Sequence, residues 1–355
     1  MNRRVALTLL ASSLTACAPV VQRAGRPAFG FEGARLDSEH FVSFDGAPLG
    51  LSVWPAQGVA EPHTVIIGLH GMNDYAGAFR LAGPYWAKAG VTTYAYDQRG
   101  YGRSPMRGVW AGQDLMGEDL RTMAMLVRRR HPKATLAVVG ESMGSAVAIT
   151  AFASDRPPDA DRLVLCAPAV WGWSSQPMAQ RLAAWVAGHA LRSWTVQPPR
   201  FIANRIWPTD NLKLWARISR DPLMLWDTRF DAVEGIIDLM EAAWRSTGGI
   251  DTPCAYFYGQ DDMVIPPKPS FEAAARLQPG RRTAWYANGY HLLLIDHQAE
   301  NVWRDTLAFI ADPAAPLPSN APPIPKPDAP EARAAIKRAE RRDRAPPEAK
   351  ALGYR

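Results

Sequence analysis

Short apolar strands alternate with helical segments along most of this chain, and that alternation limits the possible folds more than any other feature. Such an alternation is typical of a mostly parallel sheet with helices on both faces. The expected strands are a hairpin at 41–44 and 49–54, followed by 64–69, 91–96, 135–139, 162–167, 254–258 and 283–286. The expected helices are 76–89 with a break at Pro84, 114–130, 145–154, 270–277 and 299–311. The sequence therefore predicts an α/β fold over residues 38–311.

Residues 170–248 interrupt this rhythm, because they look helical and hold eight of the 13 tryptophans. We expect them to form a cap inserted into the α/β body. Two apolar stripes in the cap recur at helical spacing: Met178, Leu182, Trp185, Val186 and His189, and then Ile236, Ile237, Met240 and Trp244. Helix packing against the core is the preferred interpretation of any one of these residues, ahead of a lipid channel.

The C-terminal region has a different composition. Residues 311–330 contain eight prolines, and residues 331–344 are highly charged. We expect residues 312–355 to be a disordered, Pro-rich charged tail in which residues 331–344 form at most a solvated helix. The formal net charge of the chain is +6, but two arginines lie before residue 17, and residues 311–355 carry nine Lys/Arg against six Asp/Glu. The remaining body is nearly neutral, which argues against binding to nucleic acid.

The N-terminus has the features of a targeting segment. A basic start, Asn2-Arg3-Arg4, precedes an apolar stretch from Val5 to Ala16 that is shorter than the ~20 residues a membrane-spanning helix needs. The run Leu14-Thr15-Ala16-Cys17 resembles a bacterial lipobox, which implies a signal peptide at 1–16 and lipidation of Cys17. An ordinary signal peptide cleaved near Ala16 or Ala18 is the alternative. We expect residues 17–37 to be a tether and the protein to be lipid-anchored in the cell envelope, on the outer membrane facing the periplasm.

Cleavage there leaves Cys166 and Cys254 in the body. Cys166 lies near the end of one expected strand and Cys254 near the start of the next. In neighbouring parallel strands this offset exceeds the reach of a disulfide. We expect two buried, unpaired thiols.

The run Gly140-Glu141-Ser142-Met143-Gly144 matches the pattern G-x-S-x-G. An expected strand precedes it and a helix of small residues follows it. This strand–turn–helix context is that of a nucleophile elbow, in which a serine sits on a tight turn at the carboxyl edge of the sheet. Glycines flank the serine because backbone and helix approach too closely for a side chain. Ser142 is therefore the candidate nucleophile.

A serine nucleophile needs a general base and a third group that orients the base. In this architecture the order along the chain is serine, acid, histidine. Of the seven histidines, only His291 and His297 follow the later strands. His291 lies on the loop after strand 283–286 and is the candidate base, whereas His297 precedes a helix and is expected at its N-terminus.

Two adjacent carboxyl groups, Asp261 and Asp262, follow the strand 254–258, and composition does not separate them. The run from Tyr258 to Pro266, YGQDDMVIP, resembles the G-x-x-D-x-x-V/I-P signature of the monoacylglycerol lipase and lysophospholipase branch of the α/β hydrolases. That register implies Asp262 as the acid of the triad and leaves Asp261 as the alternative.

The resemblance covers about residues 38–311 and includes three further motifs. His70-Gly71 matches an H-G loop, which implies an oxyanion hole formed by the N–H groups of Met72 and Met143 and a structural role for His70. Asn73 replaces the glycine that the family often has there. The D-x-R-G-x-G-x-S loop, residues 97–104, implies an architectural role in which Arg99 pairs with a carboxylate near the site. Residues 220–223 resemble a D-P-L element of the cap.

Taken together, the resemblance implies an α/β-hydrolase fold with an inserted helical cap and a serine carboxylic-ester hydrolase. The expected substrates are monoacylglycerol, lysophospholipid or similar acyl esters, and the membrane is an expected partner through the anchor. No cofactor and no metal are expected, because no His/Cys cluster has ligand spacing. Epoxide hydrolases and dehalogenases share the fold but need a carboxylate where this chain has Ser142. The rival hypotheses are a thioesterase, an aminopeptidase-like hydrolase, and a non-catalytic envelope lipoprotein that would have lost part of the triad.

Overall fold

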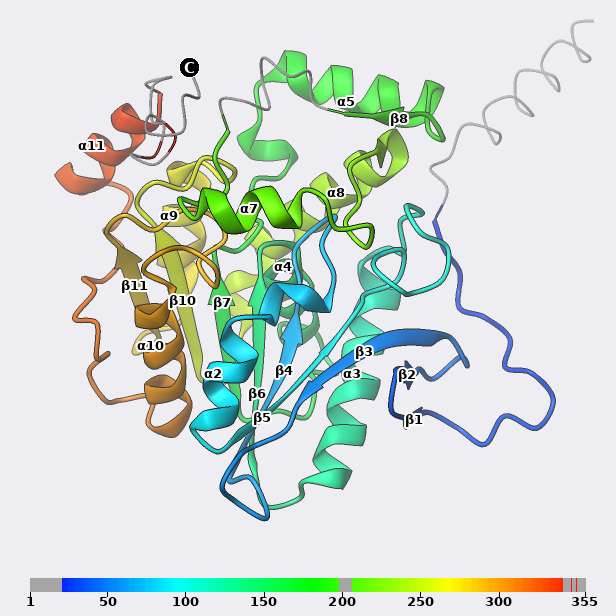
Figure 1. Ribbon diagram of the computed structural model, residues 1–355. Helices are drawn as coiled ribbons and strands as arrows, with labels where there is room; N and C mark the ends of the chain where they lie inside the picture. The colour runs from blue at the N-terminus through cyan, green and yellow to red at the C-terminus, as the bar shows by residue number, and fades with distance from the viewer. Residues whose placement is uncertain (1–20, 198–205, 341–345, 347–348, 350–355) are drawn as a thin grey trace, which may run out of the picture.

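In the computed structural model, which describes residues 21–197, 206–340, 346 and 349, a nine-stranded sheet forms the centre of the molecule (Figure 1). In spatial order the strands are β1 (Arg35–Leu36), β2 (His40–Val42), β3 (Pro48–Trp54), β5 (Val91–Tyr96), β4 (Thr64–Leu69), β6 (Thr135–Glu141), β7 (Arg162–Cys166), β10 (Cys254–Gly259) and β11 (Arg282–Tyr286). The strands from β5 to β11 are parallel, whereas β1, β2 and β3 are antiparallel additions at one edge. The predicted mostly parallel sheet is confirmed.

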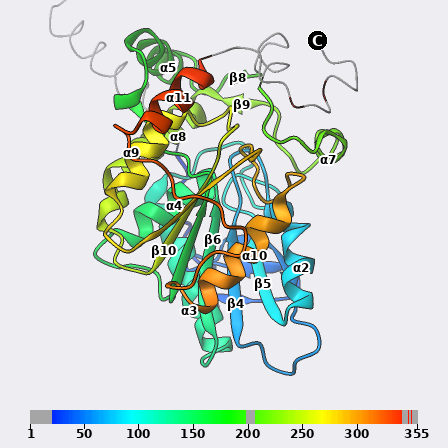
Figure 2. The same ribbon diagram turned by 90° about the vertical axis from the view of Figure 1, so that its left-hand side faces the viewer.

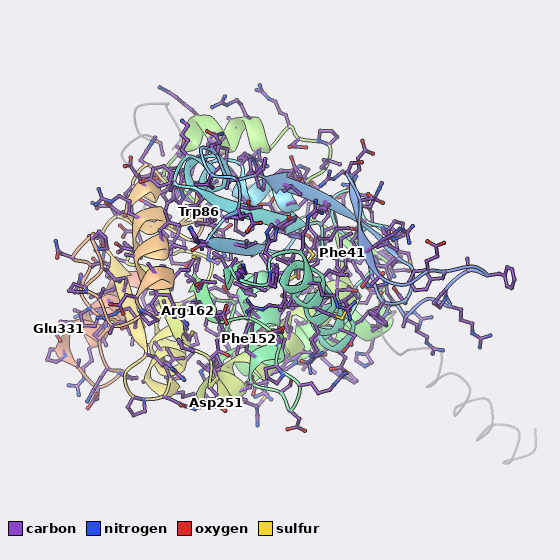
Figure 3. The ribbon with its side chains drawn as sticks, turned by 90° about the horizontal axis from the view of Figure 1, so that it is seen from below. Phe41, Trp86, Phe152, Arg162, Asp251 and Glu331 are labelled. Carbon is purple, nitrogen blue, oxygen red and sulfur yellow. The ribbon has the colours of Figure 1, made fainter. Side chains whose placement is uncertain are left out.

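Helices cover both faces of the sheet (Figure 2). The body helices are η1 (Ala76–Phe79), α2 (Ala82–Lys88), α3 (Gln113–Arg130), α4 (Met143–Phe152), α9 (Pro267–Arg276) and α10 (Ala299–Ala311). Because strand side chains alternate between faces, Val65 and Ile67 pack with α3 and α4, while Ile66 packs with α2 and α10. Trp86 and Phe152, one from each of these two cores, are labelled in Figure 3.

The helical segment at 76–89 breaks before the expected place. The 3₁₀ turn η1 ends at Phe79, and α2 begins at Ala82, so Pro84 lies in the first turn of α2. A proline is tolerated there because the first N–H groups of a helix have no intrahelical partner. The prediction of a break at Pro84 itself was therefore wrong.

The segment between β7 and β10 is mostly helical and lies over the carboxyl edge of the sheet (Figure 1). It contains η2 (Trp173–Ser175), α5 (Met178–Ala190), α7 (Leu212–Ile218), α8 (Phe230–Ser246) and η3 (Thr247–Gly249), and a small antiparallel ribbon of β8 (Thr195–Val196) and β9 (Thr228–Arg229). The stripe on α8 packs inward as expected, since Ile236, Ile237 and Met240 are buried. The stripe on α5 does not: its four apolar side chains from Met178 to Val186 are exposed.

The described part of the C-terminal tail packs against the body, which differs from the expectation of disorder. The backbone N–H of Trp285 donates to Pro322 O, and Asp305 accepts hydrogen bonds from Ser319. Farther on, α11 (Pro330–Ala339) packs against α9, with Ala332 fully buried. Proline composition predicted the extended conformation but could not reveal these partners.

The N-terminal segment from Val21 to Asp37 is also attached to the body at defined points. The sequence predicted only a tether here, without such attachments. The Gln22 side chain is buried, and the Gly25 N–H donates to Asp45 Oδ2 at 2.7 Å. Residues 1–16, Cys17 and the start of the tether lie outside the described residues. Within the part of the chain that the structure covers, no helix is both long and apolar enough to cross a bilayer.

Cys166 and Cys254 lie on the adjacent strands β7 and β10, in registers three residues apart: Cys254 is opposite Leu163, and Cys166 is opposite Phe257. Both are free and buried. The prediction of two unpaired thiols is confirmed.

Candidate active site

Ser142 sits where β6 ends and α4 begins, in a conformation that only a tight turn imposes. Its φ of 52° and ψ of −114° put it outside the regions that non-glycine residues prefer. The glycines around it are required by space: a Cβ at Gly140 would lie 2.6 Å from the Ser145 nitrogen, and one at Gly144 would lie 2.2 Å from the Leu69 oxygen. The sequence G-x-S-x-G thus folds into the predicted elbow.

The structure brings the three predicted triad residues together in one hydrogen-bonded line. His291 Nε2 lies 2.8 Å from Ser142 Oγ, and His291 Nδ1 lies 2.8 Å from Asp262 Oδ2. All three side chains are buried, with 8% of Ser142, 4% of His291 and 2% of Asp262 exposed. With the proton on Nδ1, this line gives Ser142 an acceptor for its proton and gives the imidazole a carboxylate behind it.

Local sequence explains why the acid and the histidine meet. Gly259 ends β10 against the loop after β11, where a Cβ would lie 2.3 Å from Gly289 O. The other carboxylate oxygen of Asp262, Oδ1, accepts the N–H groups of Val264 and Ile265 at 2.8 and 2.9 Å, which fixes the direction of Oδ2. The strand end and the Asp-Met-Val-Ile turn together aim this carboxylate at His291.

The neighbouring carboxylate, Asp261, points elsewhere. Its Oδ1 accepts from Arg338 Nη2 of α11 at 2.6 Å, and its backbone N–H donates to Gly289 O. His297 is also away from the triad, with its backbone N–H donating to Asp210. The geometry therefore favours Asp262 and His291 over both alternatives.

The loop after β4 runs alongside the nucleophile. A Cβ on Gly71 would lie 3.3 Å from the Ser142 Cβ, so the next residue, Met72, lies beside the site. Asn73, which stands where the family often has glycine, adopts a φ of 66°. Asparagine tolerates this left-handed conformation better than most residues, so the exchange does not prevent the turn. Met143 is the first residue of α4, where helix N–H groups are unpaired and the helix dipole favours an anion.

His70 holds this loop in place, as expected. Its Nδ1 lies 2.7 Å from Gly71 O, and its Nε2 accepts the N–H of Gln98 at 2.8 Å. Burial lowers the pKa of His70 to about 4, so its ring is neutral near pH 7 and serves as one donor and one acceptor.

The partners of Arg99 are not the one that the resemblance implied, which was a carboxylate near the site. Its guanidinium binds Asp45 in the hairpin turn and Asp119 in α3, with four contacts between 2.6 and 3.0 Å. The three side chains are buried. Arg99 therefore joins the β2–β3 hairpin to α3 and makes no contact with the triad.

Two features of the site were not found from the sequence. Glu141, inside the serine motif, is buried, and its Oε1 accepts the N–H of Leu294 in the loop that carries His291, at 3.3 Å. Burial raises the pKa of Glu141 well above its usual range. A charged residue type at the end of a buried strand was the only available signal, and it did not identify a partner.

The second missed feature is a set of hydrogen bonds between the cap and the histidine loop. The Leu292 N–H donates to Pro208 O at 2.8 Å, and Asn211 Nδ2 donates to Ile295 O at 3.0 Å. Asn211 also caps α7 by accepting the Leu214 N–H. The start of α7 and the loop bearing the histidine are thus held as one unit.

In sequence, the chain is similar to known hydrolases. The family model described as "Serine aminopeptidase, S33" matches residues 60–298. A monoacylglycerol lipase of Mycolicibacterium smegmatis is 27% identical over 243 residues, which cover 64% of this chain and 80% of that protein. A monoglyceride lipase of Rattus norvegicus is 27% identical over 135 residues, or 38% of this chain and 44% of that one.

Solved structures show the same fold. A soluble variant of monoglyceride lipase from Saccharomyces cerevisiae, in complex with a substrate analog, superposes with a TM-score of 0.65 at 20% identity and covers 82% of this chain and 99% of its own. The monoacylglycerol lipase of Paleococcus ferrophilus gives a TM-score of 0.61 at 19% identity, with coverages of 74% and 98%. The sheet, the elbow and the cap are those of an α/β hydrolase.

Proposed function

This chain belongs to the serine aminopeptidase S33 family of α/β hydrolases, an esterase and lipase group, and we propose that it hydrolyses monoacylglycerols, lysophospholipids or similar acyl esters through Ser142, His291 and Asp262. The observation that carries the proposal is the unbroken, buried line of two 2.8 Å contacts from Ser142 through His291 to Asp262. A non-catalytic scaffold has no need to keep a strained serine aimed at a carboxylate-backed imidazole.

In this mechanism His291 Nε2 takes the proton of Ser142 as Oγ attacks the ester carbonyl. Asp262 keeps the imidazole in the required tautomer and stabilises the cation. The backbone N–H groups of Met72 and Met143 hold the oxyanion, and loss of one such donor costs about 10²–10³ in rate. The tetrahedral intermediate collapses, the alcohol leaves with the proton from His291, and water then releases the acid from the acyl-enzyme by the same route.

The substrate class rests on two observations. Two relatives that match the chain are lipases of monoacylglycerols by name. The cap over the site is rich in tryptophan, which suits an apolar acyl chain better than a charged peptide.

A panel of p-nitrophenyl esters of increasing chain length, run with wild type and Ser142→Ala, tests this function. Peptide p-nitroanilides and an acyl thioester run beside it test the peptidase and thioesterase alternatives. We expect wild type to cleave medium and long acyl esters and Ser142→Ala to give the background rate. Equal rates from both proteins would support a non-catalytic protein, and a sharp fall beyond short chains would remove the lipase assignment.

We also propose that the protein is a lipoprotein of the cell envelope, on the outer membrane facing the periplasm and anchored through acyl chains on Cys17. Two or more acyl chains give stable anchoring. Metabolic labelling with a fatty-acid analogue tests this proposal: wild type is expected to take up label and Cys17→Ser is not. Unlabelled wild type would contradict it.

A further inference from the structure

The outer face of α5 is apolar, and none of the described residues covers it. Met178, Leu182, Trp185 and Val186 recur within about two and a half helical turns and are between 47% and 71% exposed. The neighbouring exposed positions include three alanines, so these side chains form one patch rather than isolated exposures. We call this four-residue surface the α5 face. Its exposure contrasts with α8, whose apolar side chains hold the cap to the body.

The charges of α5 fit a lipid surface. Residues 178–191 contain Arg181 and His189 but no aspartate or glutamate. Trp185 stacks on His189, with ring centroids 4.4 Å apart. Just beyond the helix, Trp194 is 66% exposed. A helix with exposed aliphatic side chains, exposed tryptophan and basic residues is typical of elements that lie in the headgroup region of a bilayer.

The N-terminal segment is fixed to the body on the flank of the same cap. Gln22 is 5% exposed; its N–H donates to Trp110 O and its Nε2 donates to Val109 O, both at 2.7 Å. The indole of Trp110 packs on Gly235 of α8, where a Cβ would lie 2.3 Å from Nε1. Figure 1 shows the described N-terminal end next to the end of α8 near β8.

The step from α8 to α5 is short. Glu234, the residue before Gly235, touches α5: a Cβ on Gly188 would lie 2.2 Å from Glu234 Oε2. The carboxylate also lies 3.2 Å from His189 Nδ1. Two adjacent residues of α8 therefore contact both the attachment of the N-terminal segment and the helix that bears the exposed patch.

Only four residue steps separate Val21 from the proposed lipidation site at Cys17, and four residues reach at most about 14 Å. A bilayer that holds acyl chains on Cys17 must therefore lie close to the cap flank rather than at the opposite end of the sheet. We propose that the α5 face docks into the headgroup region of that bilayer and that Gln22, by fixing the N-terminal segment, sets this orientation. The proposal rests on the lipid anchor and on the esterase function. Docking in this orientation presents the cap to substrate in the membrane.

Depth-dependent quenching tests the docking directly. A fluorophore is attached to Leu182→Cys or, as the control, to Lys133→Cys on an exposed loop beyond the far end of α3. The mature full chain is placed on phosphatidylethanolamine–phosphatidylglycerol vesicles that contain a spin-labelled phospholipid. We expect strong quenching at position 182 and little at 133. Weak quenching at both positions would overturn the proposal, as would cross-linking through position 182 to a second copy of the chain.

Activity on two substrates separates docking from catalysis. In Leu182→Glu/Trp185→Glu we expect hydrolysis of an acyl ester held in vesicles to fall about tenfold or more, while hydrolysis of soluble p-nitrophenyl butyrate is unchanged. Gln180→Glu adds a charge to an exposed polar position of the same helix and is expected to keep both rates. Equal losses on both substrates would overturn the docking surface. A wild type inactive on butyrate would instead refute the esterase proposal, with quenching at position 182 still deciding the docking.

Discussion

Replacing Asp262 by asparagine should stop catalysis by reversing the tautomer of His291. Asp262 Oδ1 accepts two backbone N–H groups, from Val264 and Ile265. An amide NH₂ cannot occupy that position, so the amide oxygen of the variant takes it and the NH₂ faces His291 Nδ1. The imidazole then carries its proton on Nε2 and cannot accept the proton of Ser142.

The expected loss in kcat is about 10⁴, or about 5.5 kcal/mol of transition-state stabilisation. The matched control is Asp261→Asn, one residue away, which removes a contact to a half-exposed Arg338 side chain. A pair of this kind contributes about 0.2–1 kcal/mol, so kcat should stay within about fivefold of wild type.

Hydrolysis of a p-nitrophenyl ester under saturating conditions measures both variants, and thermal unfolding by circular dichroism checks that both fold. Similar losses in the two variants would refute this account of the acid, and so would a larger loss in Asp261→Asn. A folded Asp262→Asn with nearly wild-type kcat would show that the carboxylate does not select the tautomer.

Three further predictions concern the residues around the triad. Glu141→Leu leaves the Leu294 N–H without its buried acceptor, so it should lower the free energy of unfolding by about 1–3 kcal/mol and also lower kcat. Glu141→Gln keeps an acceptor and should restore stability in urea unfolding and kcat in ester hydrolysis. A failure of this rescue would contradict the role of Glu141. Arg99→Met leaves two buried carboxylates unpaired and should destabilise the fold by about 3–5 kcal/mol in thermal unfolding, so an unchanged melting temperature would count against the network. Because burial lowers the pKa of His70 from 6.5 to about 4, the unfolded chain binds a proton first as the pH falls, and wild type should lose on the order of 3 kcal/mol between pH 6.5 and about 4. His70→Gln should lack this loss, and an identical pH slope in both proteins would disprove it.

The sequence predicted the sheet well because each strand is a short apolar run ended by a turn, and that pattern depends on local residues. The elbow at Ser142 was predictable for the same reason, since Gly140 and Gly144 mark a close approach of backbone. The choice between Asp261 and Asp262 depended on the register of a resembling motif. The structure gives the physical basis of that choice, because the N–H groups of the following turn orient only Asp262.

What could not be predicted depends on partners far along the chain. The tail looked unpacked because proline-rich sequence has no periodicity, yet its attachment to β11 relies on single hydrogen bonds between residues far apart along the chain. The stripe on α5 has the spacing of a packed helix face, and spacing alone does not tell whether a core or solvent lies beyond it. The burial of Gln22 could not be predicted either, since a polar side chain in an irregular segment gives no sign of burial.

The most direct measurement of the central claim is the site of covalent attack. The protein is treated with a fluorophosphonate, which reacts with activated serines, and the modified peptide is identified by mass spectrometry. We predict a single adduct on Ser142 in wild type, lost in Ser142→Ala together with ester hydrolysis. An adduct on another residue, or ester hydrolysis that continues in Ser142→Ala, would contradict the proposed nucleophile.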